Sequence, residues 1–269
     1  LIVDDGINLN ATLIPAEAGE LEYLSSDESV VSVNSLGEVT AVGNGTANIT
    51  VRFAGNYKYA AAESKNVTVT VRIATNITVE RDDIEMNVAN TTEINATLTP
   101  SEAGELDYTS SDVSVVTVNG IGEITAVGEG RAIITVRFIE NDIYAASSIN
   151  ITVTVALNNA SVSAEDISMI IGENATINVT TSPEGLNVTY IVDDSGVVSL
   201  ENGVLTALRE GTAKINLTVG GDGKYVLNST EITVTVSKVE TSVSIESDNI
   251  EINVGDSAEI KASLTPSEA

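Results

Sequence analysis

The residues best suited to carry chemistry in this sequence are asparagines that stand two positions before a serine or threonine. Asn-x-Ser/Thr is the acceptor sequence for N-linked glycans in secreted proteins. Strand alternation offers a second explanation, because residues i and i+2 of a strand share a face. Asparagine is depleted in strands, so we predict that several of these sites are glycosylated. The candidates are Asn10, Asn44, Asn48, Asn66, Asn76, Asn90, Asn95, Asn150, Asn159, Asn174, Asn178, Asn187, Asn216 and Asn228.

Acidic pairs form a second candidate group. Carboxylates combined with loop carbonyls suit a hard cation such as Ca²⁺. The pairs follow no calcium-loop spacing, and they do not stand at equivalent positions of the repeats described below. We therefore expect no cofactor, and keep a calcium ion between domains as the alternative to solvated turns. The residues concerned are Asp4 and Asp5, Glu80, Asp82 and Asp83, and Asp193 and Asp194.

The chain offers little for catalysis. It contains no cysteine and no histidine, so a thiol nucleophile, a disulfide and the commonest general base and metal ligand are all missing. The six lysines are scattered along the chain. A Lys–Asn isopeptide cross-link would need a lysine on a buried strand face, whereas Lys214 alternates outward with Asn216. We predict that the chain is not an enzyme.

Net charge limits the partners. The chain has 39 acidic residues against 12 basic ones, a formal net charge of −27. Nucleic acids and anionic membranes are bound through clusters of Lys and Arg. No apolar run reaches the roughly 18 residues that a membrane span needs. We therefore expect no nucleic-acid partner and no membrane insertion in this segment.

Internal repeats dominate the sequence. The stretch GELEYLSSDESVVSVNSLGEVTAVGNG (19–45) returns as GELDYTSSDVSVVTVNGIGEITAVGEG (104–130). Anchor residues recur every 81 to 85 positions, the size of a small domain rather than of a solenoid turn. The anchors are Pro15, Pro100, Pro183 and Pro266, then Tyr23, Tyr108 and Tyr190, and Gly45, Gly130 and Gly211. The predicted domains are repeat 1 (1–73, without its first strand), repeat 2 (74–155), repeat 3 (156–236) and the start of repeat 4 (237–269).

Within a repeat the apolar residues alternate with a period of two. In ANITVRF (47–53) one face carries Ala, Ile, Val and Phe and the other Asn, Thr and Arg. This alternation is typical of antiparallel strands with one buried face. About seven short strands per repeat, separated by turn residues, predict an all-β fold of tandem Ig-like β-sandwich domains.

Several positions of the repeated stretch have predicted structural roles. We expect Val39 and Ala41 to point inward, and Gly37 to lie in a tight turn. Gly45 opens the next strand at a point where a side chain should not fit. The recurring tyrosines are predicted to be core residues: Tyr23, Tyr59, Tyr108, Tyr144, Tyr190 and Tyr225.

The segment TPSEAGELDYTSSDVSVVTVNGIGEITAVGEGRAIITV (99–136) resembles the bacterial Ig-like domain, group 2, of invasin/intimin-type surface proteins. The shared features are the proline, an aromatic followed by serines and an acidic residue, a valine-rich strand, a glycine turn and "TAV". Tyrosine stands where the family usually has tryptophan. The third repeat departs further, with YIVDD (190–194) in place of the Ser-Ser-Asp turn and LTAL (205–208) in place of "TAV".

Two further segments, GNYKYAAA (55–62) and NDIYAASS (141–148), resemble Ig-like repeats of archaeal, methanogen adhesin-like proteins. The resemblance implies an extracellular, cell-surface stalk or adhesin array. It transfers no binding site, because the shared residues are core and turn residues.

The links between repeats contain no flexible tether. NVTVTVRIATNITVERDD (66–83) passes from one repeat into the next without glycine or proline. Flexible linkers are rich in Gly and Ser. We therefore predict a linear, semi-rigid array whose partners are neighbouring Ig-like domains of the same or an adjacent chain.

The two ends of the sequence allow two explanations. Repeat 1 lacks the counterpart of residues 75–85, and residues 238–252 hold a spare opening strand. Either the sequence is a fragment of a longer array, or the spare strand of one chain is donated to repeat 1 of the next in a head-to-tail filament. The tail also repeats the second strand, ending in LTPSEA (264–269), which favours the fragment.

The sequence thus predicts a non-enzymatic cell-surface spacer. The alternative is an adhesin module that binds a cell-wall or host glycan or protein. Glycan sites usually carry exposed aromatic side chains, and this chain has only seven tyrosines and two phenylalanines, most of which recur by repeat. The spacer is therefore favoured.

Overall fold

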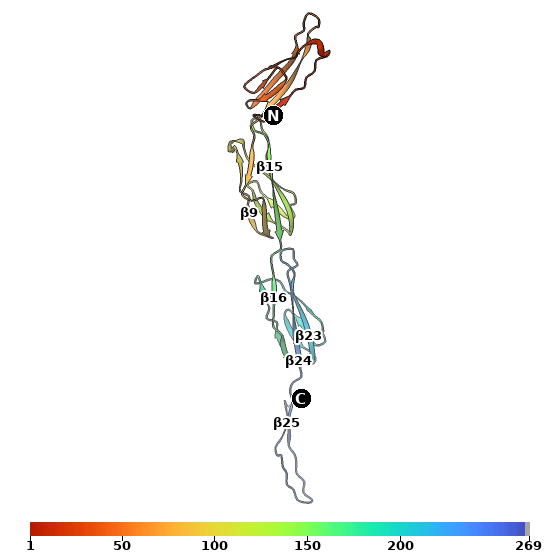
Figure 1. Cartoon of the computed structure of the whole chain (residues 1–269). Helices are drawn as coiled ribbons and strands as arrows, with labels where there is room; N and C mark the ends of the chain where they lie inside the picture. Colours follow the sequence, from red (N-terminus) through yellow and green to blue (C-terminus); the bar gives the residue numbers. More distant parts are fainter. Residues whose placement is uncertain (267–269) are drawn as a thin grey trace. The chain divides into compact units, whose positions relative to one another are not determined.

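The computed structural model describes residues 1–266, which separate into two compact units, one of residues 1–157 and one that begins at residue 158. The first unit holds repeats 1 and 2, and the second holds repeat 3 and the tail (Figure 1). Within residues 1–266 no helix combines the length and the apolar character needed to cross a membrane. The regular structure is almost entirely β, which confirms the predicted fold class of tandem Ig-like β-sandwiches.

Repeat 2 shows the complete sandwich. Its four-stranded sheet has the order β11-β14-β15-β8, its three-stranded sheet the order β12-β13-β9, and β7 pairs with β10. All pairings are antiparallel except that of β8 with β15. The elements are β7 (Asn76–Val79), β8 (Asp83–Asn87), β9 (Thr91–Glu93), β10 (Ala96–Thr99), the 3-10 helix η2 (Ser101–Ala103), β11 (Asp107–Ser110), β12 (Val116–Val118), β13 (Glu123–Ala126), β14 (Gly130–Phe138) and β15 (Ser147–Ala156).

Repeat 3 has the same topology although its sequence has diverged. Its sheets have the orders β17-β24-β23-β20, β18-β22-β21 and β16-β19. The long strands β23 and β24 lie side by side along nine paired residues (Figure 1). The strands are β16 (Ser161–Ser163), β17 (Ile167–Ile170), β18 (Asn174–Thr176), β19 (Thr180–Ser182), β20 (Thr189–Val192), β21 (Val198–Glu201), β22 (Val204–Ala207), β23 (Gly211–Val219) and β24 (Asn228–Ser237).

Repeat 1 and the tail are each less complete. The sheets of repeat 1 have the orders β1-β4-β3 and β2-β5-β6, and Ile2 bridges Arg72 in parallel where β8 would lie. In the tail, β25 (Ser242–Ile245) pairs only with β26 (Ala262–Thr265). The elements of repeat 1 are β1 (Gly6–Asn8), the 3-10 helix η1 (Ala16–Ala18), β2 (Glu22–Ser25), β3 (Val31–Val33), β4 (Glu38–Ala41), β5 (Gly45–Phe53) and β6 (Ala62–Val71).

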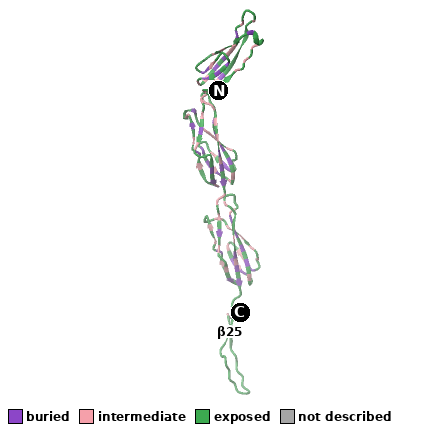
Figure 2. Cartoon of the chain, in the orientation of Figure 1, coloured by how far each residue is buried: buried purple, intermediate pink, exposed green. Residues whose placement is uncertain are grey.

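Each repeat encloses a core of its own, built from small aliphatic side chains. Figure 2 shows the buried residues inside the three repeats, whereas the tail around β25 is exposed. The most deeply buried side chains stand at equivalent positions, since Ile49, Ile134 and Ile215 are each 0% exposed. Full burial of one such side chain contributes about 1.5–3 kcal/mol. Val39 and Ala41, at 1% exposure each, point inward as the alternation predicted.

The recurring tyrosines are not core residues, contrary to the prediction. All six are half-buried. Tyr108, Tyr144 and Tyr190 pack against the outside of their repeat cores. A phenol hydroxyl needs a polar partner or water, which the aliphatic interior does not supply. The Tyr108 ring instead covers the tight turn at Gly122, where a Cβ would lie 3.0 Å from it.

A glycine opens the longest hairpin of each repeat. Both its backbone conformation and the space around it require glycine, as predicted for Gly45. Gly45, Gly130 and Gly211 have φ values of 141°, 149° and 152°. A Cβ at these positions would lie 2.9, 2.9 and 3.0 Å from a valine methyl group of the same repeat. Both the backbone conformation and the lack of space therefore exclude a side chain.

We predict that Gly130→Ala destabilises repeat 2 by about 1–3 kcal/mol, because it strains the backbone and forces Val115 to move. Hydrogen exchange of the β14 and β15 amides would measure the loss. Gly120→Ala is the matched control, since a Cβ there meets nothing within 4 Å. Equal exchange rates in the two variants would contradict this explanation.

Candidate functional site

All fourteen sequon asparagines are exposed in the structure. On the long hairpins of repeats 1 and 2, three of them accept a hydrogen bond from a threonine of the neighbouring strand. Thr50 Oγ1 donates to Asn66 Oδ1, and Thr135 Oγ1 donates to Asn150 Oδ1, each at 2.9 Å. Thr68 and Asn48 make the same contact at 2.8 Å. The strand asparagines therefore form cross-strand hydrogen bonds that were not predicted. Their outward alternation with threonine is the sequence pattern that indicates this role.

The sequon asparagines differ in whether the side-chain nitrogen Nδ2 donates a hydrogen bond. Asn66 and Asn150 use only Oδ1 in these contacts, so Nδ2, the atom that carries an N-linked glycan, faces solvent. In contrast, Asn95 Nδ2 donates to Glu80 Oε2 at 2.8 Å, and Asn10 Nδ2 donates to the carbonyl of Asn8 at 3.2 Å. Glycan attachment at Asn66 or Asn150 thus preserves the cross-strand contact, whereas attachment at Asn95 competes with an existing hydrogen bond.

Repeat 3 replaces the Thr–Asn contact with an ion pair. Glu231 stands at the position of Asn150 and accepts from Lys214 Nζ at 2.6 Å. This hydrogen bond, supported by the charge of Glu231, raises the pKa of Lys214 above its ordinary value. Lys214 is exposed, as its alternation with Asn216 predicted.

The acidic residues of the Ser-Ser-Asp turns act as acceptors. Asp112 Oδ1 accepts from the N–H of Ser114 at 2.9 Å and from its hydroxyl at 2.6 Å. The hydrogen bond from the hydroxyl, followed by that from the N–H, holds the pKa of Asp112 below its ordinary value of 3.8. Asp27 has the same contacts with Ser29 and the same direction of pKa shift. These carboxylates stabilise turns.

In repeat 3 the diverged pair Asp193–Asp194 accepts the equivalent hydrogen bonds from the main chain. Asp194 Oδ1 accepts from the N–H of Gly196 at 2.9 Å, as Asp112 does from Ser114. Asp193 Oδ1 accepts from the N–H of Lys214 at 2.7 Å. At the equivalent point of repeat 2 the Ser111 hydroxyl accepts from Ile133 N–H. The replacement of Ser-Asp by Asp-Asp therefore preserves both hydrogen bonds.

The pair Asp4–Asp5 lies at a turn, and the pair Asp82–Asp83 lies at the start of β8. Asp4 has a φ of 74°, and Asp5 Oδ2 accepts from the N–H of Ile2 at 2.9 Å. The main-chain carbonyl of Asp82 accepts from Thr152 N–H at 2.8 Å, beside the start of β8. Across residues 1–266, no three Asp or Glu side chains converge as metal ligands would.

A loop before β15 fixes the start of repeat 2. Asn141 Nδ2 donates to the carbonyl of Ala103, and Oδ1 accepts from the N–H groups of Ile143 and Tyr144. Ile73 then bonds this loop through its own N–H and carbonyl, to Ile143 and Ala145. The segment that leads into β7, the first strand of the repeat, is thereby attached to the loop.

The same arrangement recurs in repeat 3. Asp222 accepts from the N–H groups of Lys224 and Tyr225, and Asn158 bonds the loop through its main chain. The contact between this loop and the segment before the first strand was not predicted from the sequence. The spacing Asn/Asp-x-x-Tyr in each repeat was the signal that identifies it.

Arg72, which directly follows β6 of repeat 1, also contacts this loop. Arg72 Nε donates to the carbonyl of Asn141 at 2.7 Å, and its guanidinium lies 3.6 Å from the Glu140 carboxylate. The Arg72 side chain is only 28% exposed, so it is more restrained than the exposed ion pairs of the chain. The connection between the two repeats is thus hydrogen-bonded rather than free.

The fold and these contacts define a tandem array of β-sandwich modules. A family model of the bacterial Ig-like domain (group 2) matches residues 1–62 and 73–142. Over these two repeats the chain belongs to the bacterial Ig-like domain (group 2) family, which confirms the resemblance stated above.

The chain is also similar to an uncharacterized protein of Clostridium acetobutylicum, with 28% identity over 139 residues. That alignment covers 50% of this chain and 14% of the relative. Among solved structures, domains 1–6 of the surface layer protein SbsC align at 17% identity and a TM-score of 0.33, over 84% of this chain and 36% of that one. Drosophila N-cadherin EC1-3 aligns at 12% identity and a TM-score of 0.25, over 87% and 92% of the two chains. The family assignment rests on the two matched repeats alone.

We predict an acid-sensitive contribution of Asp112 to the stability of repeat 2. Because its folded-state pKa lies below 3.8, this contribution is complete above that pH and is lost as the pH falls through the folded-state value. Urea unfolding at a series of pH values, followed by the NMR signals of Val116 and Ile134, would measure it. Asp112→Asn should flatten the profile in this window, and Ser114→Ala should flatten it partly. An unchanged profile in Asp112→Asn would show that the turn does not couple to protonation.

Proposed function

We propose that this chain is a non-enzymatic spacer in an extracellular, cell-surface stalk. The observation that supports it is the repetition of one closed sandwich, in which the segment leading into the first strand is hydrogen-bonded to the Asn/Asp-x-x-Tyr loop in repeats 2 and 3. A link fixed in this way limits bending, because its backbone groups are already paired. Such a module holds other domains at a distance from the cell, and its partners are neighbouring Ig-like domains.

The surface chemistry supports an extracellular location. All fourteen sequons present their asparagines to solvent, and a net charge of −27 opposes association between like-charged copies. We propose that glycans occupy several of these sites. Charge and glycans together keep neighbouring stalks separate and hinder proteases.

No observation favours the adhesin alternative. Among residues 1–266 the one fully exposed aromatic side chain is Tyr57. A hollow of about 690 Å³ in repeat 3 is lined by Glu165, Asp166 and Ile167 among small polar residues, and no aromatic side chain lines it. A glycan ligand would find no stacking surface there.

Mass spectrometry of glycopeptides from the native protein tests the surface-stalk proposal. We predict hexose-type additions with higher occupancy at Asn66 and Asn150, whose Nδ2 atoms face solvent, than at Asn10 and Asn95, whose Nδ2 atoms are bonded. Asn119, which is exposed but followed by Gly-Ile, is the internal control and should remain bare. Bare asparagines throughout would refute glycosylation and leave the sequons as products of strand pairing.

A further inference from the structure

One Asn-x-Thr sequence stands at the same point of all three repeats. The residue before it donates its main-chain N–H to a turn glycine, from Ile94 to the Gly122 carbonyl at 2.8 Å and from Ile177 to the Gly203 carbonyl at 3.1 Å. The same position therefore has different surroundings in repeats 2 and 3. The three sequences are NAT (10–12), NAT (95–97) and NVT (178–180).

In repeat 2 the connection from β7 to β8 covers this asparagine. Asn95 Nδ2 donates to Glu80 Oε2 at 2.8 Å, and the Glu80 N–H donates to the Asn95 carbonyl at 3.3 Å. The two segments that change sheet, 80–82 and 94–95, are thereby joined. The nitrogen that would carry a glycan is held by a carboxylate.

The corresponding connection in repeat 3 is two residues shorter. Ile77, which pairs with β10, and Ile84, which pairs with β15, are separated by the six residues 78–83. Their counterparts Val162 and Ile167 are separated by the four residues 163–166. The contact that Glu80 makes is lost, and the Asn178 side chain makes no hydrogen bond among the described residues.

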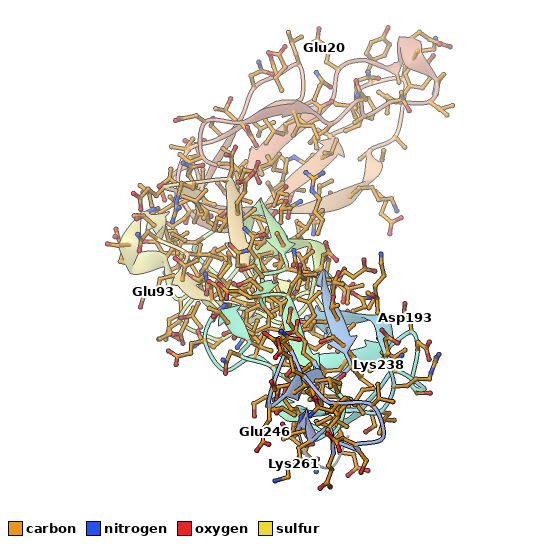
Figure 3. All side chains as sticks on the ribbon, turned by 90° about the horizontal axis from the view of Figure 1, so that it is seen from below. Glu20, Glu93, Asp193, Lys238, Glu246 and Lys261 are labelled. Carbon is orange, nitrogen blue, oxygen red and sulfur yellow. The ribbon has the colours of Figure 1, made fainter. Side chains whose placement is uncertain are left out.

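The Asn178 amide instead borders the hollow of about 690 Å³ described above, which it lines together with Ser163, Glu165 and Asp166. Thr176 also lines it, whereas repeat 2 has the longer Glu93 at that position, an exposed side chain that projects from the ribbon (Figure 3). The hollow therefore offers hydroxyl groups and carboxylate oxygens on both sides of a free amide nitrogen.

Resting on the glycosylation part of the proposed function, we propose that Asn178 carries an N-linked glycan whose first sugar lies in this hollow. In the attachment a bond forms between Nδ2 and the sugar C1, Nδ2 loses one proton, and the bond from C1 to the phosphate of an activated glycan donor breaks. The donor and the transferase are supplied by the cell. The first sugar then starts from a residue that itself lines the hollow.

Covalent attachment is what allows this hollow to hold a sugar. A free glycan would find no aromatic stacking surface there. An attached sugar is present at a high effective concentration, so a few hydrogen bonds of ordinary strength are enough to hold it. The hollow is thus suited to the chain's own glycan rather than to a ligand from solution.

The charges of the hollow select the kind of sugar. Asp166 accepts from the Thr233 N–H through Oδ1 at 2.7 Å, and its second oxygen has no partner among the described residues. This oxygen and the Glu165 carboxylate can accept hydrogen bonds from sugar hydroxyls or from an N-acetyl N–H. Both carboxylates repel an acidic sugar. The linking sugar is therefore a neutral hexose or N-acetylhexosamine.

Glycopeptide mass spectrometry of the chain made in cells that attach N-linked glycans tests the site. Occupancy at Asn178 should exceed that at Asn95 by about threefold or more, the effect of one hydrogen bond on Nδ2. Glu80→Ala should raise the occupancy of Asn95, whereas Glu85→Ala, which removes an exposed carboxylate of β8, should not. Replacement of residues 163–166 by residues 78–83 should lower Asn178 to the level of Asn95.

Two negative outcomes are distinguishable. A bare Asn178 in a chain glycosylated elsewhere, or an acidic linking sugar on Asn178, would overturn this inference alone. A chain that is bare throughout would also refute the glycosylation on which it rests.

Hydrogen exchange tests whether the sugar lies in the hollow. The amides of residues 163–168 should exchange about threefold or more slowly in the glycosylated chain than in Thr180→Val, which lacks the acceptor sequence but keeps Asn178. Asn178→Gln should behave like Thr180→Val. The matched control is Thr152→Val, which removes the acceptor sequence of Asn150 in repeat 2 and should leave these amides unchanged. Equal exchange with and without the Asn178 glycan would show that the sugar extends into solvent and would overturn the placement.

Discussion

Each repeat depends on the pairing of its two longest strands. In repeat 2, β14 and β15 pair along nine residues and turn a continuous aliphatic face inward. Because this face contains little aromatic surface, no single large side chain can close it, and cover must come from further strands on both sides. The topology follows from this requirement, since β8 covers the free edge of β15 while β7 and β10 cover the remaining opening.

Much of this architecture was predictable from the sequence. Alternation with a period of two identified the buried faces of β5 and its counterparts, and Gly45 was expected to exclude a side chain. The division of the opening segment between two sheets was not predictable, because residues 76–87 read as one run of strand residues. Only the parallel register of β8 on β15 shows that Ile77 and Ile84 cover different parts of the core.

At some positions different residue types make the same contact in different repeats, and this equivalence could not be predicted from the sequence. The pair Asp193–Asp194 was interpreted as a departure from the Ser-Ser-Asp turn, yet it accepts the same hydrogen bonds. The tyrosines were assigned to the core because they recur, whereas Tyr23 and Tyr108 cover the glycine turns at Gly37 and Gly122. The sequon asparagines were difficult for a related reason. Their contacts with threonine explain why a residue depleted in strands persists on these hairpins, and leave Nδ2 available for a glycan.

The acidic charge of the surface affects the association of copies more than it affects the stability of each repeat. Each sandwich is held by a core without buried polar residues, so an acidic surface costs the fold little. Two copies with a net charge of −27 nevertheless repel each other over about 10 Å at an ionic strength of about 0.1 M. Any association between copies must overcome this repulsion, and added salt weakens the repulsion by screening the charges. A contact that depended on surface ion pairs alone would weaken.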